Sequence, residues 1–233
     1  MALSNFKIPP RFVETTNINE ELKKQVRVFV GNVSESEALI MFEEDVDKKL
    51  ISYLKKMCRN SFEYKEYIKH FRDMMGNTAC KVLGIDVDEV PVSLEIHHTP
   101  FSLETIICAV TAQMFDIQGP PLDPKDIAEK VMKLHYEGKV GLIPLTSTIH
   151  EAVHSNTIHV KVSDIYGDYQ QFFEDYEEYL DQDSIDHYNN VISLRDEEVE
   201  LYNREKLKRV ISEYNVVYED DDDSLKYKKE VRT

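Results

Sequence analysis

The stretch VSLEIHH, residues Val92–His98, decides the fold that we predict. It follows Pro91 and alternates apolar with polar side chains, which is typical of a strand with one buried face. We expect this strand to cover Val92–Ile96 and to end in the pair His97-His98. Because successive side chains of a strand point to opposite faces, the two histidines should face opposite sides of the sheet.

A second stretch, VGLIPLTSTIHEAVH, covers residues Val140–His154. Its first part, Val140–Leu145, is a short apolar segment that predicts a second strand, which would form an antiparallel hairpin or short sheet with the first. The Thr146-Ser147 pair then supplies a cap for a helix. His150 and His154 are four residues apart on this helix, so both imidazoles project from one face and can hold one divalent ion.

Helical patterns dominate the rest of the chain, so the predicted fold class is α+β, mostly helical with a small ββα-metal core. The helices that apolar spacing and capping residues predict are Glu37–Met57, Tyr64–Met75, a helix capped by Ser102 that runs through Met114, a helix from Asp123-Pro124 to Tyr136, Gln170–Leu180 and Asp186–Tyr214. Further short strands are predicted at Gln25–Val30 and Ile158–Val162.

The same patterns divide the chain into four regions. Residues 1–90 form a mixed strand and helical region, and residues 91–165 form the core with a helical insertion. Residues 166–218 form an acidic helical extension, and residues 219–233 an acidic tail that we expect to be disordered.

Charge argues against tight binding to nucleic acid. The chain has 233 residues with 28 Lys and Arg against 44 Asp and Glu, a formal net charge of −16 at pH 7. Residues 1–155 carry 18 basic and 23 acidic residues, a net of −5, whereas residues 156–233 carry 10 and 21, a net of −11. Binding to a phosphate backbone usually depends on Lys and Arg. The charge therefore handicaps a nucleic-acid function without excluding it.

Cysteine content and hydropathy bear on the compartment. Cys58, Cys80 and Cys108 are odd in number and lack any CxxC spacing, which indicates reduced thiols rather than a disulfide framework. No apolar run approaches the ~20 residues that cross a bilayer, and the N-terminus lacks the apolar region of a secretory signal. We expect a cytoplasmic protein that does not bind membranes.

A His-His pair at the end of a strand, followed by HxxxH on a helix, resembles the HNH (ββα-metal, His-Me finger) nucleases, particularly the branch typified by the colicin DNases. The resemblance implies that His97 is a metal ligand, that His98 is the general base that activates water, and that His150 and His154 complete the ligand set. It implies metal-dependent phosphodiester hydrolysis by an endonuclease, with DNA as the expected substrate. Three imidazoles suit zinc or another transition metal better than magnesium, which stays an alternative.

The sequence departs from the HNH pattern in three respects, one of which is that no basic cluster flanks the motif, although Lys125, Lys130, Lys133 and Lys139 form a weak positive run. Gly141 stands where the family has an Asn that braces the loop and orients the base. The chain between the two histidine pairs is long and is filled by two extra helices. The small size and acidic character of the chain also resemble bacteriophage proteins, and a phage-encoded member would act in the host cytoplasm.

The competing interpretation is a non-catalytic, acidic interaction protein. Such a chain could bind a basic nucleic-acid-binding protein or mimic DNA, with a relic or structural metal site. Glu95 shares the strand face of His97, so it can form a hydrogen bond behind a ligand. His135 and His159 are interpreted as single packing or surface residues. An assay for metal-dependent cleavage separates the two hypotheses.

Overall fold

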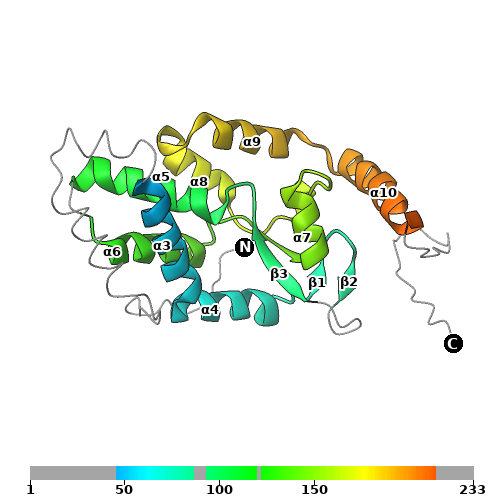
Figure 1. Cartoon of the computed structure of the whole chain (residues 1–233), viewed down its shortest axis with the longest axis horizontal. Coiled ribbons are helices and arrows are strands. Elements are labelled where there is room, and N and C mark those ends of the chain that lie inside the picture. The colour runs from blue at the N-terminus through cyan, green and yellow to red at the C-terminus, as the bar shows by residue number, and fades with distance from the viewer. Residues whose placement is uncertain (1–45, 87–92, 120–121, 214–233) are drawn as a thin grey trace.

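The computed structural model describes residues 46–86, 93–119 and 122–213, to which every structural statement below refers (Figure 1). The described chain is α+β and mostly helical, with two small antiparallel sheets of two strands each. The predicted strand at Gln25–Val30, the start of the helix predicted from Glu37, Val92 and the acidic tail of residues 219–233 lie outside the described residues.

Three helices form the main core. They are α3 (Val46–Asn60), α5 (Leu103–Gln118) and α6 (Pro124–Tyr136), which pack against one another. Their apolar side chains recur at helical spacing and are almost completely buried: Leu54, Met57, Ile106, Ile107, Val110, Ile127, Val131 and Met132. Helix α4 (Phe62–Lys69) continues into a single π-helical turn, η1 (His70–Met74), so the helix predicted at Tyr64–Met75 is regular over its first part only.

Capping residues set the bounds of the two inserted helices as the sequence predicts. The Ser102 hydroxyl accepts a hydrogen bond from the Thr105 amide at 3.0 Å and begins α5. The Asp123 carboxylate accepts from the Lys125 amide at 2.8 Å and begins α6, with Pro124 at the first helical position. These helices occupy the long connection between the two strands of the core sheet.

That sheet pairs β3 (Leu94–His98) with β4 (Leu142–Thr146) in antiparallel register. His97 lies opposite Ile143, and His98 lies opposite Leu142. Both strands sit slightly later in the chain than predicted, so the histidine pair lies inside β3 rather than after it. Helix α7 (Ser147–His154) follows β4 directly and packs against both strands, with Thr146 as its N-cap residue. A second small sheet, β1 (Ala79–Cys80) with β2 (Ile85–Asp86), borders β4.

Gly141 is fixed by a close approach of two backbones. A Cβ atom at this position would lie 1.9 Å from the carbonyl oxygen of Thr99. The Thr99 amide donates a hydrogen bond to the Gly141 carbonyl at 3.0 Å. No side chain fits here, so the loop that leaves β3 is braced by backbone contacts instead of by the Asn side chain that the HNH pattern expects.

The strand predicted at Ile158–Val162 is wrong. Residues 158–161 have no regular structure, and Val162–Asp164 form a 3-10 turn, η2. The backbone groups of this segment bond to side chains of the last helix instead of to a strand. The side chain of Asn203 accepts a hydrogen bond from the His159 amide and donates one to its carbonyl, and Asp196 accepts from the Val162 amide.

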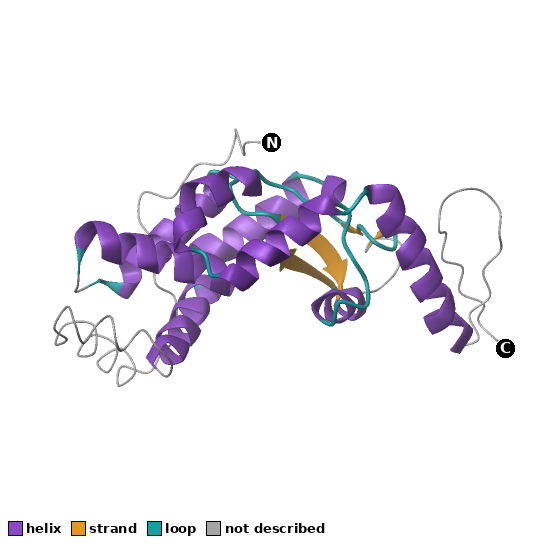
Figure 2. Cartoon of the chain, turned by 90° about the horizontal axis from the view of Figure 1, so that it is seen from above, coloured by secondary structure: helices purple, strands orange, loops and turns teal. Residues whose placement is uncertain are grey.

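The C-terminal region is helical, as predicted, but the helices have different boundaries. They are α8 (Tyr169–Tyr176), the 3-10 turn η3 (Glu177–Tyr179), α9 (Gln182–Ser193) and α10 (Asp196–Glu213). The helix predicted over Asp186–Tyr214 is two helices, because Leu194 adopts an extended conformation and ends α9. Figures 1 and 2 both show α10 extending away from the rest of the described chain.

Candidate metal centre

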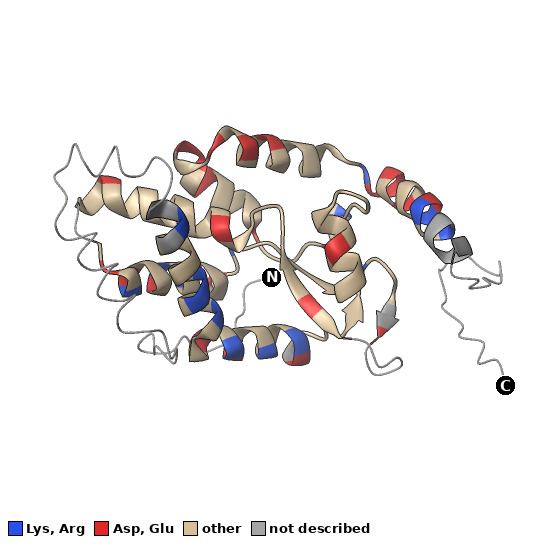
Figure 3. Cartoon of the chain, viewed as in Figure 1, with Lys and Arg blue, Asp and Glu red and all other residues tan. Residues whose placement is uncertain are grey.

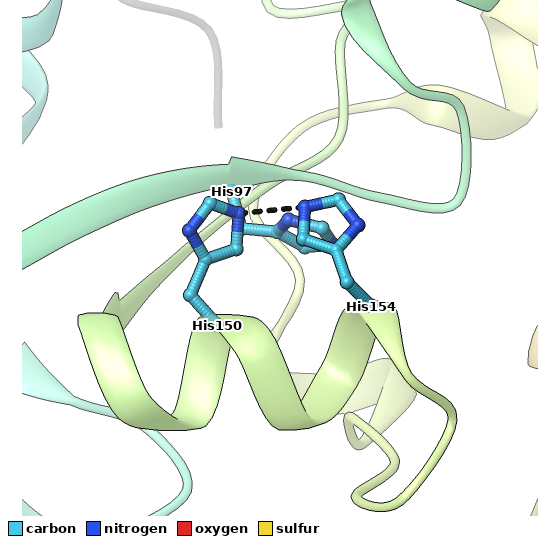
Figure 4. Close-up of side chains that lie close together, drawn as sticks. All are labelled: His97, His150 and His154. Atoms are coloured by element: carbon cyan, nitrogen blue, oxygen red, sulfur yellow. Dashed lines mark hydrogen bonds between the residues drawn. The ribbon is translucent and has the colours of Figure 1, made fainter.

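Three of the four predicted site histidines converge between β3 and α7 (Figure 4). One nitrogen from each of His97, His150 and His154 lies within 4.8 Å of the other two. The Nε2 atoms of His150 and His154 are 3.0 Å apart. The ring centroids are 4.6 to 4.8 Å apart in all three pairs. Three imidazoles are thus placed where one small ion could contact all of them.

The local sequence explains this convergence. β4 and α7 are consecutive, so the helix folds back along the sheet that it has just left. Residues four apart on a helix lie on the same face, which places His150 and His154 toward β3. His97 lies on the face of β3 that α7 covers. The hairpin therefore supplies one candidate ligand nitrogen, from His97, and the helix that follows supplies two, from His150 and His154.

Glu95 supports this cluster from behind. It lies two residues before His97 on β3, and therefore on the same face of the strand. Its Oε2 atom is 2.5 Å from Nδ1 of His150. A carboxylate only accepts hydrogen bonds, so Nδ1 carries the proton and the lone pair on Nε2 of His150 points toward Nε2 of His154. This is the tautomer that a metal ligand needs, and carboxylate–histidine pairs of this kind are common behind bound metals.

Burial and mutual repulsion favour the neutral forms of His97 and His154. Desolvation, followed by the nearby charges of His150, His154 and His187, lowers the pKa of His97 to about 3. Desolvation and the neighbouring His150 also lower the pKa of His154. Neutral imidazoles present lone pairs rather than protons at pH 7, so protons compete little with a cation for these two residues.

His98 does not join the other three histidines. The alternation of β3 turns its ring to the opposite face, where it is 8% exposed and stacks on Tyr64. Its Nε2 atom is 3.0 Å from Nε2 of the fully buried His135, whose Nδ1 is 2.8 Å from the Val131 carbonyl. That carbonyl fixes the His135 proton on Nδ1, so His98 donates through Nε2. The geometry therefore differs from the expectation that His98 stands beside the metal as a general base.

A cavity of about 370 Å³ opens beside the cluster. It is lined by His97, His98 and His154, and by Asp181, Asp183 and His187 of the α9 region. None of the described residues that line it is Lys or Arg. Three protein nitrogens leave a further coordination position for a tetrahedral ion, and the adjoining cavity gives a reactant access to it.

The sequence did not identify His135 and His187 as neighbours of the four candidate site histidines. His135 follows Val131 by four residues on the buried stripe of α6, and this spacing supports the packing interpretation. Its contact with His98, 37 residues earlier, has no signal in the sequence. His187 follows Asp183 by four residues on α9, and this Asp-xxx-His spacing could have drawn attention to it. His159 rests against Tyr202 with ring centroids 4.7 Å apart.

Comparison with known proteins identifies the family of this chain. The sequence matches the family described as Bacteriophage G278-like virion protein over residues 1–223. No curated protein and no solved structure matches the chain. None of the helices in the described part of the chain is both long and apolar enough to cross a membrane.

Proposed function

The chain belongs to the Bacteriophage G278-like virion protein family, and from that premise we propose a phage enzyme that hydrolyses phosphodiester bonds, with DNA as substrate, by means of one divalent transition-metal ion. His97, His150 and His154 hold the ion in this proposal. The observation that carries it is the convergence of three imidazoles, from a hairpin and the helix that follows it, beside an open cavity. Membership of a virion protein family favours a place in the phage particle over the cytoplasm as the site of action.

The donor set fits zinc or a similar ion. A tetrahedral ion with metal–nitrogen distances of ~2.1 Å requires ligand nitrogens about 3.4 Å apart. The Nε2 atoms of His150 and His154 are already 3.0 Å apart, and the widest pair in the cluster is within 4.8 Å. Nitrogen donors favour zinc, nickel or copper over magnesium, which prefers oxygen.

The order of elements supports the HNH-like interpretation. An antiparallel hairpin, β3 with β4, is followed at once by a helix that packs on it, and the ligands come from the first strand and the helix. The ion, once bound, would stabilise the negative charge that develops on the phosphate. The chain itself adds Arg59 at the end of α3, whose positive charge contributes to the lowered pKa of His154. This exposed guanidinium can attract a phosphate group toward the cluster.

A second function is favoured by the charge distribution. Residues 156–233 carry a net charge of −11, and acidic side chains are frequent on α8, α9 and the start of α10 (Figure 3). An acidic face suits a basic protein partner better than DNA. In this alternative the histidine cluster holds a structural ion, and the protein acts by binding a basic, nucleic-acid-binding partner.

The deciding experiment is hydrolysis by the full chain, stripped of metal and reloaded with Zn, Ni, Mn or Mg. Substrates are single- and double-stranded DNA, RNA and bis(p-nitrophenyl) phosphate, a small diester that avoids repulsion of a polyanion. We expect metal-dependent cleavage that falls at least ~100-fold in His154→Ala, because a ligand is lost. Glu151→Gln, on the same helix, is the matched control and should keep full activity. Protein that binds metal but hydrolyses none of these substrates is the interaction protein of the second proposal.

A further inference from the structure

The cavity beside the histidine cluster brings α9 into the candidate active site. Its volume of about 370 Å³ holds a phosphodiester group together with an attacking water, which occupies ~30 Å³ in the liquid. His97 and His154 reach this space from β3 and α7, and His187 reaches it from α9. These residues are separated by at least 33 positions in the sequence, so only the fold brings them together.

A hydrolytic site of this kind needs a proton acceptor that can meet water. His98, which the HNH resemblance assigns to that role, also lines this cavity, but its side chain is only 8% exposed and its Nε2 donates a hydrogen bond to His135. Glu95 is bound to Nδ1 of His150. Both groups are thus engaged with other histidines. A solvent-exposed acceptor on another element of the wall is better placed to exchange protons with water.

We propose that His187 is the general base that takes the proton from the attacking water, an inference that rests on the proposed phosphodiester hydrolysis. His187 is exposed to solvent and lines the same cavity as His97 and His154, as a group that exchanges protons during turnover must. The attacking water would lie between His187 and the phosphate, within hydrogen-bond distance of the ring.

Two further observations support His187. Its charge is one of the causes that lower the pKa of His97, so the two rings lie within electrostatic reach of each other. Partial desolvation lowers the pKa of His187 itself, which keeps the imidazole neutral and able to accept a proton at pH 7. Asp183 lies one turn earlier on α9, and Asp181 caps the helix. Both carboxylates line the cavity together with His187.

His159 also lines the cavity, but it is less well placed than His187 to act as the base. His159 lies against the Tyr202 ring of α10, and its backbone is held by Asn203 on both its amide and its carbonyl. It is not among the charges that act on His97. His159 therefore serves to join the 158–162 segment to α10, and His187 is the residue that faces the cluster.

The proposed step conserves atoms and electrons. His187 accepts one proton of the water molecule, and the electron pair of that O–H bond stays on the water oxygen. This oxygen forms a bond to phosphorus while the bond from phosphorus to the leaving oxygen breaks. The leaving oxygen keeps the electron pair of the broken bond and takes a proton from solvent. The protonated His187 returns its proton to bulk water, which its exposure allows.

The test compares His187→Ala with wild type and with Asn190→Ala, an exposed control on the same helix. Loss of a general base should lower kcat by ~10²–10⁴-fold. The acidic limb of the pH–rate profile should disappear, and added imidazole should restore part of the activity by entering the vacated space. Zinc affinity, measured by calorimetry without substrate, should stay within about threefold of wild type because His187 is not a ligand.

Several results would overturn this inference. Loss of zinc binding in His187→Ala would make the residue a ligand, and a kcat within about threefold of wild type would remove it from the reaction. A large loss in His159→Ala, without one in His187→Ala, would transfer the role to His159. These outcomes presuppose a wild-type protein that cleaves. If wild-type protein cleaves none of the substrates, the proposed phosphodiester hydrolysis is wrong, and this result is distinct from a negative result for His187.

Discussion

Glu95 holds the imidazole of His150 in the orientation that metal binding needs, through its 2.5 Å contact with Nδ1. Removing such a supporting carboxylate typically weakens metal affinity 10–100-fold. We expect Glu95→Gln to reduce zinc affinity by about that factor while the fold remains intact, as measured by calorimetric titration. Glu151→Gln removes a neighbouring carboxylate that supports no ligand and should leave the affinity unchanged. Equal affinities in Glu95→Gln and wild type would remove Glu95 from the metal centre.

The buried pair of His98 and His135 predicts a loss of stability in acid. Burial lowers the pKa of His135 to about 4, whereas an unfolded histidine titrates near ~6.5. Between these values the unfolded chain binds a proton that the folded chain does not. The free energy of unfolding should therefore fall as the pH is lowered from 6.5 to 4, and should be independent of this residue above that window.

Thermal unfolding of metal-free protein checks this expectation. The Tm should drop between pH 7.5 and pH 4.5, and the drop should be smaller in His135→Gln, whose amide does not titrate but can still accept from His98. If the Tm of His135→Gln falls as steeply with decreasing pH as the Tm of wild type, groups other than His135 cause the acid sensitivity.

At the residue scale, the sequence predicted the cluster of His97, His150 and His154 from a strand-end position and an i, i+4 spacing. The same two-residue alternation of the strand also separates His98 from His97. What the sequence did not contain is the partner on the far side of the strand. His135 of α6 meets His98 of β3 although the two are 37 residues apart, and such long-range contacts follow from the tertiary fold rather than from local spacing.

At the element scale, the close approach of β3 and β4 at Gly141 leaves no room for a side chain. A Cβ atom would overlap the Thr99 carbonyl, which is backbone and cannot rotate away. Gly141→Ala should therefore destabilise the protein by about 1–3 kcal/mol or more, because the start of β4 must move off the end of β3. Chemical denaturation measures the effect. Gly119→Ala is a comparison with open space around its Cβ, where only the positive φ of 66° is strained. A Gly141→Ala protein as stable as wild type would contradict the close approach.

The elements with strong local signals were predicted well. Ser102 and Asp123-Pro124 fixed the starts of α5 and α6, because side-chain caps act within a few residues. The segment Ile158–Val162 was predicted as a strand from its apolar alternation and is irregular instead. Its hydrogen-bond partners are Asn203 and Asp196, more than 30 residues later, and local alternation carries no information about them.

At the scale of the whole molecule, the net charge of −16 predicts an unusual response to salt. Nucleases that bind through 6–10 phosphate contacts lose ~10³–10⁵-fold in affinity between 50 and 200 mM salt. Here none of the described cavity-lining residues is basic, and the basic side chains gather on α3 and α4 instead (Figure 3). Added salt should mainly screen repulsion. We expect KM for DNA to stay constant or to decrease over this range in steady-state assays. A steep increase would indicate a basic binding surface elsewhere.

The central claim is that His97, His150 and His154 together hold one transition-metal ion. It is tested most directly by the zinc content of the full chain after equilibrium dialysis near pH 7.5, in wild type and in His154→Ala. The account predicts about one tightly bound zinc per wild-type chain and almost none in the variant, with both proteins folded by circular dichroism. A wild-type protein that retains no zinc, or a His154→Ala protein that retains as much as wild type, would contradict it.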